Sequence, residues 1–177
     1  MSDQRITGRK TVWQHKSKAF RVDELTVESE GSDNIQWATF ERGDAVAALI
    51  VNTDTNHVML IRQFRPPVAS MEGAEHKLLE TMAGMVLQNE EIPQSLSREI
   101  TEETGYEIPF NADTGTLKGS EFICEFYSSP GGSSERIYLY YVAVDSSTPK
   151  KAGGGLREQG ERIETVLMPL GEFFKAV

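Results

Sequence analysis

Apolar and polar residues alternate along several stretches of the chain, and this period-two pattern is typical of half-buried β-strands. Three alternations open the sequence, at residues 11–27 (TVWQHKSKAFRVDELTV), 35–43 (IQWATFERG) and 44–51 (DAVAALIV), and the polar stretch EGSDN separates the first two. A further strand is expected at 57–65 (HVMLIRQFR), after the turn NTDTN. The pattern therefore predicts that the chain begins with strands only.

The pattern changes to a helical period once, at residues 91–105 (EIPQSLSREITEETG). Leu96 and Ile100 are spaced to face a core, Pro93 suits the first turn, and Gly105 suits the C-terminal cap. Around this helix we expect a loop at 65–70, where prolines remove ladder donors. We expect strands at 76–84, 119–129, 135–145 and 162–170, a Gly/Pro/Lys-rich loop at 146–161, and a helix beginning at 171–177. The chain is predicted to be mixed α/β.

Three glutamates of the predicted helix, Glu99, Glu102 and Glu103, share one face because they are three and four residues apart. Like charges at this spacing repel each other by a few tenths of a kcal/mol per pair. A solvated charged face is one explanation. The other is a cation site: hard cations such as Mg²⁺ prefer oxygen ligands, and they neutralise a pyrophosphate while acidifying the attacking water.

The residues around this face favour the cation site. Gly84, five residues, Glu90, seven residues and then REITEETGY resemble the Nudix box, G-x5-E-x7-R-E-U-x-E-E-x-G-U with U aliphatic. Only Tyr106 departs, at a last position that packs the helix. The resemblance implies a Nudix α/β/α sandwich with a mixed sheet and an N-terminal antiparallel β segment. It implies a β-rich, dimerising segment at 1–43 and a Nudix hydrolase domain at 44–177.

The resemblance also assigns roles around the metal, Mg²⁺ or alternatively Mn²⁺. Its metal ligands are the backbone carbonyl of Ala83 and the carboxylates of Glu99, Glu102 and Glu103. Glu102 is a catalytic candidate as well. A further acid from the 146–161 loop acts as base toward water or as an additional ligand; Glu161 aligns best and Glu158 is the alternative. Arg98 and Glu90 are expected to brace the loop-helix-loop by a salt bridge.

Four other segments, FERGDAV, LIRQFRPP, ETMAG and SPGGSSER, resemble ADP-ribose pyrophosphatases in the same order. GDP-mannose hydrolases share the pattern almost as well, including a residue other than proline before "AG", here Met82. Arg62 and Arg65 could hold a diphosphate through charge-assisted bidentate bonds. The resemblance implies that Trp37, more than Trp13, stacks the nucleobase, and that Glu135 contacts the ribose or a water shell.

The expected reaction is hydrolysis of a nucleoside diphosphate sugar, first ADP-ribose to AMP and ribose 5-phosphate, with GDP-mannose as the alternative. A catalytically idle, nucleotide-sugar-binding Nudix domain is a second class, although idle versions usually lose box acids and all remain here. A net charge of −9 and a pI near 4.9 argue against nucleic-acid partners, RNA decapping included.

The cysteine count and the distribution of apolar residues limit the possible cellular location and covalent structure of the protein. The lone cysteine, Cys124, excludes an internal disulfide and a Cys-rich metal site, and we expect it to be a small core residue. Neither a signal peptide nor a membrane span is visible, so a cytoplasmic protein is expected. Because unpaired strand edges at the N-terminus need a partner, a homodimer is expected.

Overall fold

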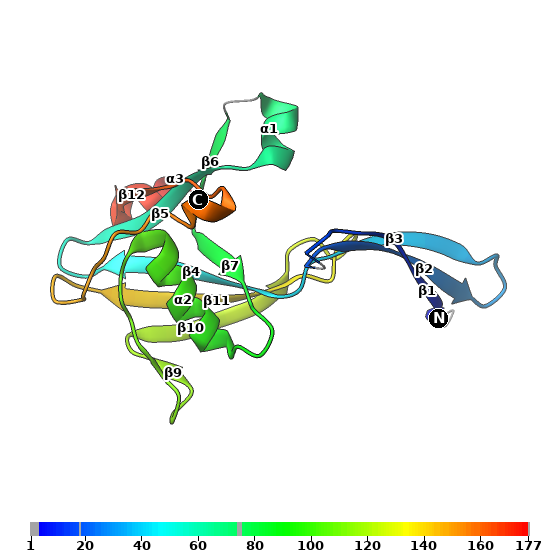
Figure 1. The fold of residues 1–177 in the computed structure, drawn as a ribbon, viewed down its shortest axis with the longest axis horizontal. Coiled ribbons are helices and arrows are strands. Elements are labelled where there is room, and N and C mark those ends of the chain that lie inside the picture. The colour runs from blue at the N-terminus through cyan, green and yellow to red at the C-terminus, as the bar shows by residue number, and fades with distance from the viewer. Residues whose placement is uncertain (1–3, 18, 74–75, 177) are drawn as a thin grey trace. The chain divides into compact units, whose positions relative to one another are not determined.

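The computed structural model describes residues 4–17, 19–73 and 76–176, which divide into two compact units (Figure 1). The first unit comprises Met1–Ala45 with Glu125–Ile137, and the second comprises Val46–Cys124 with Tyr138–Val177. The hairpin end at 125–137 therefore groups with the N-terminal segment, from which it is far removed in sequence. None of the described helices is long and apolar enough to span a membrane.

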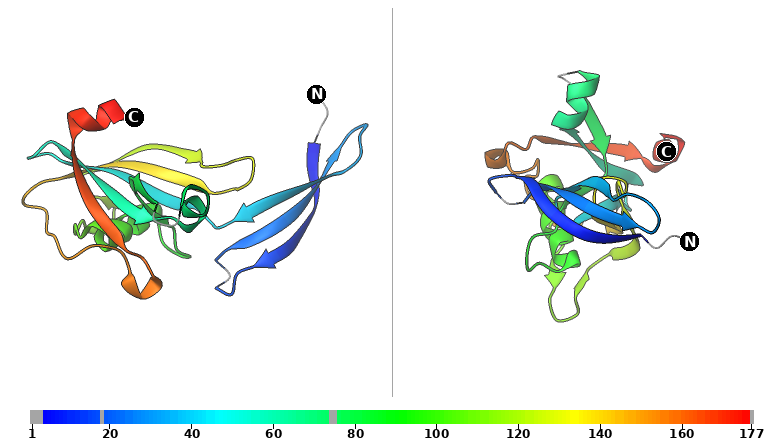
Figure 2. Two further views of the ribbon diagram at one scale, coloured as in Figure 1. Left: turned by 90° about the horizontal axis from the view of Figure 1, so that it is seen from above. Right: turned by 90° about the vertical axis from the view of Figure 1, so that its right-hand side faces the viewer.

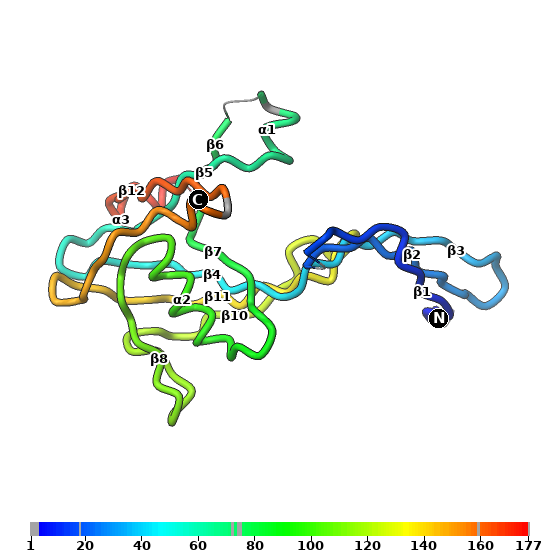
Figure 3. The backbone as a smooth tube through the Cα atoms, in the orientation of Figure 1, coloured from blue at the N-terminus to red at the C-terminus, as the bar shows by residue number. Residues whose placement is uncertain are grey.

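The N-terminal sheet of the first unit has three antiparallel strands in the order β1-β2-β3 (Figure 3). Their bounds are β1 Gln4–Gln14, β2 Arg21–Ser29 and β3 Ile35–Glu41. The single alternation expected at 11–27 is thus wrong in extent, because a turn divides it into two strands. The backbone N–H of His15 closes that turn on the carbonyl of Phe20, at 2.8 Å.

A buried carboxylate joins the first two strands. Asp23 accepts hydrogen bonds from Arg21 (2.9 Å), Arg9 (2.7 Å) and the Thr11 hydroxyl (2.8 Å). The hydrogen bond from Arg21 contributes most to holding its pKa at about 2. Since Asp23 lies opposite Thr11 in the strand register, this network favours one pairing of β1 with β2.

The second unit is built on a seven-stranded sheet with the order β10-β11-β4-β5-β12, in which β6 also pairs with β5 and β7 with β4. The strand bounds are β4 Ala45–Asn52, β5 His57–Phe64, β6 Lys77–Glu80, β7 Met82–Met85, β10 Ser120–Tyr127, β11 Arg136–Val144 and β12 Ile163–Pro169. The segments expected at 57–65, 119–129, 135–145 and 162–170 are confirmed as strands.

Helices cover the two faces of this sheet (Figures 1 and 2). On one face α2 (Ile92–Thr104) buries Leu96 and Ile100 completely, as its period predicts, against Val46, Ile50 and Val142 among others. On the other face Val51, Val58 and Leu60 pack against α3 (Leu170–Ala176). The expected α/β/α sandwich with an added antiparallel β segment is confirmed.

Three local expectations are wrong. Residues 65–70 were expected as a loop, but α1 (Pro66–Glu72) forms there because proline fits the first helical turn, where its N–H is not needed. The strand at 76–84 is broken at Thr81 into β6 and β7, since each half pairs with a different neighbour. Cys124 is exposed and not in the core, because its strand β10 lies at the edge of the sheet.

Three short elements carry no clear sequence signal. They are β8 (Phe110–Asn111), β9 (Thr116–Leu117) and the 3₁₀ turn η1 (Arg157–Gln159). The first two form a small antiparallel hairpin, and η1 interrupts the Gly-rich loop before β12. Two-residue strands and single turns are too short to show a period.

Candidate metal and phosphate site

Helix α2 is fixed at both ends by its own sequence. At its start Glu91 and Gln94 form a reciprocal capping box. At its end Gly105 adopts a left-handed conformation, with φ of +83°, and a side chain there would collide with the carbonyl oxygen of Lys151 at 2.2 Å. These two caps fix the ends of α2, and the box glutamates on the helix lie beside β7.

Arg98 braces the loop-helix-loop. Its Nε and Nη2 each donate to the Glu90 carboxylate at 3.0 Å, and Nη2 also donates to the carbonyl of Met85 at 2.8 Å. The expected salt bridge between Arg98 and Glu90 is confirmed. The remaining nitrogen, Nη1, lies 2.7 Å from Glu99 and 3.2 Å from Glu102. One guanidinium thus offsets part of the repulsion on the acidic face.

Glu103 is the most deeply buried of the box carboxylates, with 5% of the residue exposed. The backbone amide of Ala83 hydrogen-bonds to its carboxyl group, whereas Oε2 is buried and has no hydrogen-bond partner among the described residues. Burial, followed by the charges of Glu99 and Glu161, raises the pKa of Glu103 to about 8. A buried acceptor without a donor, surrounded by negative charge, is suited to a cation.

Gly84 leaves room for the second carboxylate. A Cβ at this position would lie 1.9 Å from Cδ of Glu99 and 2.2 Å from both of its carboxylate oxygens. The Glu99 carboxylate therefore occupies the space that any other residue would fill. Burial raises the pKa of Glu99 as well, against the opposing effect of Arg98. The Glu102 side chain is more exposed than that of Glu99, and an ion pair with Arg98 fixes its position.

The Gly-rich loop is attached to the last turn of α2. The amides of Gly154 and Gly155 donate to the carbonyls of Glu103 (2.9 Å) and Glu102 (3.1 Å). This attachment places Glu161 where its charge acts on Glu99 and Glu103. Its Oε2 accepts a hydrogen bond from the amide of Leu156 at 3.0 Å. The alternative acid, Glu158, is exposed on η1.

The residues present fit a hard divalent cation. Within the described ranges no group of three or more His, Cys, Asp or Glu side chains is arranged to hold a metal ion. Mg²⁺ does not need one, because it usually takes one or two carboxylates and completes its octahedron with water and substrate phosphate. Glu99, Glu103 and the backbone of Ala83 are the groups that could provide such a partial set.

The two candidate arginines differ in their surroundings. Arg65 follows β5 and forms a forked ion pair with Glu80, at 3.1 Å from Nε and 2.8 Å from Nη2. Its charge also acts on Glu103 and Glu161. Arg62 instead pairs with Glu164 on β12 at 3.4 Å, and both side chains are exposed. Only Arg65 is thus associated with the carboxylates of the candidate site.

Comparison with known proteins agrees with this geometry. The family model described as NUDIX domain matches residues 41–176, which is most of the chain.

The chain belongs to the Nudix family.

Two curated relatives of this Nudix chain are called GDP-mannose pyrophosphatase. The protein of Cronobacter sakazakii is 33% identical over 138 residues, covering 78% of this chain and 66% of the relative. That of Citrobacter koseri is 34% identical over 131 residues, covering 74% and 62%. The matched stretches are thus just under two thirds of these relatives. A crystal structure of an ADP compounds hydrolase has the same fold, with a TM-score of 0.72, 18% identity, and coverage of 98% of this chain and 82% of that one.

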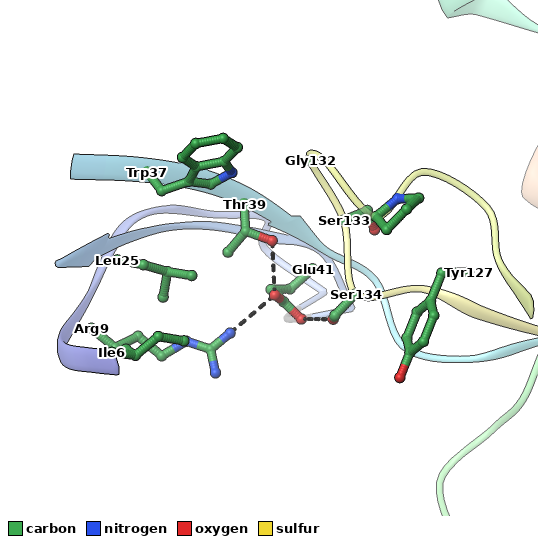
Figure 4. Close-up of a pocket in the computed structure, with 11 residues that line it drawn as sticks. Ile6, Arg9, Leu25, Trp37, Thr39, Glu41, Tyr127, Gly132, Ser133 and Ser134 are labelled. Atoms are coloured by element: carbon green, nitrogen blue, oxygen red, sulfur yellow. Dashed lines mark hydrogen bonds and ion pairs between the residues drawn. The ribbon is translucent and has the colours of Figure 1, made fainter. Parts of the chain in front are cut away.

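The first unit of this Nudix chain contains a hollow of about 490 Å³ beside Trp37 (Figure 4). Its apolar wall includes Trp37 and Tyr127. Its polar side is a network in which Glu41 binds Arg9 (3.0 Å), the Thr39 hydroxyl (3.0 Å) and the Ser134 hydroxyl (2.5 Å). Trp37 is half exposed, and its Nε1 donates to the carbonyl of Gly131 at 3.0 Å.

The structure gives partners to Glu135, and it places two further acids, Glu41 and Glu80, beside these sites. Glu135 pairs with Arg42 at 3.0 Å and accepts from Ser128 at 2.8 Å, within the first unit. Glu41 and Glu80 lie in the segments FERGDAV and ETMAG, whose resemblance assigns no role to either residue. For Glu80 a signal existed, since an acid closes the apolar strand KLLE just before the box glycine.

Proposed function

We propose that this Nudix protein hydrolyses the pyrophosphate bond of a nucleoside diphosphate sugar, and that Mg²⁺ is the metal it uses, with Mn²⁺ as a substitute. The observation that carries the proposal is the buried, unpartnered oxygen of Glu103 beside Glu99 and the backbone of β7. A solvated charged face, the competing explanation, would leave these carboxylates exposed.

The chain's own residues supply binding and proton transfer. Glu99, Glu103 and the carbonyl of Ala83 would hold the metal, with Glu102 beside them. When bound, the metal neutralises the diphosphate and lowers the pKa of the attacking water. Arg65 binds diphosphate oxygens through the guanidinium N–H groups that Glu80 does not use.

The Gly-rich loop supplies the base. Glu161 accepts the proton of the attacking water, and Glu158 is the alternative acid. For this step Glu161 has to leave the amide of Leu156, which the surrounding glycines permit because the loop can move. The water oxygen then bonds to one phosphorus while the bridging P–O bond breaks, giving a nucleoside monophosphate and a sugar phosphate.

Two substrates have separate support. Four sequence segments favour ADP-ribose, whereas the curated relatives, together with Met82 before Ala83–Gly84, favour GDP-mannose. Because both relatives are at least 33% identical to this chain over the matched stretch, we place GDP-mannose first and ADP-ribose second. We propose that Trp37 stacks the nucleobase of either substrate and that Glu135 contacts the ribose through water.

We also propose that two copies pair through the N-terminal sheet. Its strands expose Ile6, Val12, Trp13 and Ile35, a concentration of large apolar side chains that is unusual on a free surface. A second copy with the same strands would cover them. Sedimentation at micromolar concentration should show a dimer, and a monomer alone would reject this assembly.

The function is tested with a panel of nucleoside diphosphate sugars in the presence of Mg²⁺, followed by product identification. Formation of a nucleoside monophosphate and a sugar phosphate, abolished by EDTA, is expected. Binding of the same compounds without turnover would instead support the idle, binding-only alternative.

A further inference from the structure

Strand β6 reverses the usual placement of apolar and charged side chains. Leu79 is 41% exposed, whereas the side chain of its neighbour Glu80 is only 22% exposed. Exposing a leucine and turning a glutamate inward is unfavourable for stability alone. Such local conflicts are expected where a function requires them.

The partner of Glu80 accounts for its inward direction. Arg65 donates to both oxygens of Glu80 from Nε (3.1 and 3.2 Å) and to Oε2 from Nη2 (2.8 Å). A fork of this kind fixes the plane of the guanidinium as well as its position. It leaves Nη1 and one hydrogen of Nη2 for a ligand.

Glu80 also connects Arg65 to the metal side of the site. It lies opposite Ile61 in the pairing of β5 with β6, and only Thr81 and Met82 separate it from Ala83. The amide of Ala83 in turn binds the carboxyl group of Glu103. Glu80, which holds Arg65, therefore lies on the same stretch of backbone as Ala83, which contacts the buried carboxyl group of Glu103.

Without Glu80, the acids that remain among those acting on Arg65 are acids of the site. Glu103 and Glu161 both act electrostatically on Arg65. Only the deprotonated Glu103 can pair with either cation, so an arginine free to swing toward it would compete with the metal for Oε2, which has no other donor among the described residues.

We propose that Glu80 is a positioning residue that holds Arg65 away from the metal-binding carboxylates, so that the cation is reserved for the diphosphate and does not compete with the metal. This inference rests on the proposed function, because it assumes that Glu103 binds a metal. In an ordinary structural ion pair, loss of Glu80 would lower the free energy of unfolding but would have no effect on metal binding that depends on Arg65.

The test measures Mn²⁺ binding without any nucleotide, from the loss of the free-ion signal in electron paramagnetic resonance. In Glu80→Gln the released Arg65 should weaken Mn²⁺ binding about tenfold, because the metal must first break the ion pair between Arg65 and a site carboxylate. In the double variant Arg65→Gln/Glu80→Gln no competing cation remains, and affinity should return to within about threefold of wild type. Arg65→Gln alone should bind Mn²⁺ at least as well as wild type.

Glu164→Gln is the matched control, because it removes an ion pair to the same strand, β5, outside the site. It should leave Mn²⁺ affinity unchanged. Glu80→Asp keeps the charge but shortens the side chain, so it should give a smaller loss that Arg65→Gln again relieves. This variant decides the question if thermal melting shows that Glu80→Gln is unfolded.

Unchanged Mn²⁺ affinity in a folded Glu80→Gln would overturn the inference. So would an equal loss in the single and double variants, because that pattern means a structural role. These outcomes do not depend on turnover. A protein that hydrolyses no nucleotide sugar could still show the Arg65-dependent rescue, and an active enzyme could lack it.

Discussion

Replacing Glu103 with glutamine separates the metal role of this residue from its effect on folding. The amide is nearly isosteric with the carboxyl group but is neutral and a much weaker ligand for a hard cation. With the wild-type carboxylate, burial and neighbouring charges raise the pKa from 4.5 to about 8 in the folded, metal-free protein. The substitution should therefore have opposite effects with and without metal.

The sign of the stability effect follows from proton binding. Between about pH 4.5 and about pH 8 the folded state keeps the Glu103 proton and the unfolded state has lost it, so the free energy of unfolding falls as pH rises through this window. At pH 7 a shift of this size corresponds to a loss of about 3 kcal/mol relative to pH 4. In Glu103→Gln this contribution to the slope should disappear.

The assay is thermal or urea unfolding of both proteins in EDTA from pH 4 to pH 8.5, repeated with Mg²⁺. At pH 7 in EDTA, Glu103→Gln should be more stable than wild type by about 2–3 kcal/mol. Mg²⁺ should stabilise wild type far more than the variant, because only the folded wild type has the ligand. Turnover of the variant should fall at least about 100-fold.

A substitution on the exposed face of α3, Glu172→Gln, serves as the control and should change none of these quantities. The reasoning is refuted if Glu103→Gln retains hydrolysis within about threefold of wild type. Equal stabilisation of both proteins by Mg²⁺ would refute it independently.

Three further substitutions test other parts of the account. Gly84→Ala places a methyl group 1.9 Å from Cδ of Glu99, so Mg²⁺ titration should show markedly weaker metal binding in a folded protein. Normal metal binding would show that the Glu99 carboxylate does not need the space that Gly84 leaves. Arg98→Ala leaves Glu90 without its main partner and should lower the free energy of unfolding by about 1–3 kcal/mol in urea titration; an unchanged midpoint would show that the brace is dispensable. Trp37→Ala should raise KM about tenfold, or ~1–2 kcal/mol, with little change in kcat; unchanged steady-state constants would remove Trp37 from base binding.

Sequence predicted most reliably those features that local spacing determines. The helix 91–105, its buried residues Leu96 and Ile100, and the shared face of the glutamates follow from periodicity and capping within one short stretch. Tyr106, the one departure from the box, is buried in the core beside α2, as its packing role predicts. The salt bridge between Arg98 and Glu90, in contrast, was expected from the resemblance to the Nudix box.

The sequence did not predict features that depend on which strands pair with each other. The partner of Arg65 could not be assigned, because Glu80 reaches it only once β6 pairs with β5. The exposure of Cys124 depends on β10 being an edge strand, and neither hydropathy nor spacing reveals strand order. The sequence also could not show which of Arg62 and Arg65 lies near the candidate site, since both belong to the same short segment, RQFR.

We propose above that the carboxylate face of α2 serves metal-dependent hydrolysis of a nucleoside diphosphate sugar. The most direct measurement is ³¹P NMR of GDP-mannose and of ADP-ribose incubated with wild type and Mg²⁺, with EDTA and Glu103→Gln as parallel samples. We expect the diphosphate resonances to be replaced by two monophosphate resonances in wild type with Mg²⁺ alone. Persistence of both diphosphates with the folded, Mg²⁺-saturated wild type, or equal cleavage in EDTA, would contradict it.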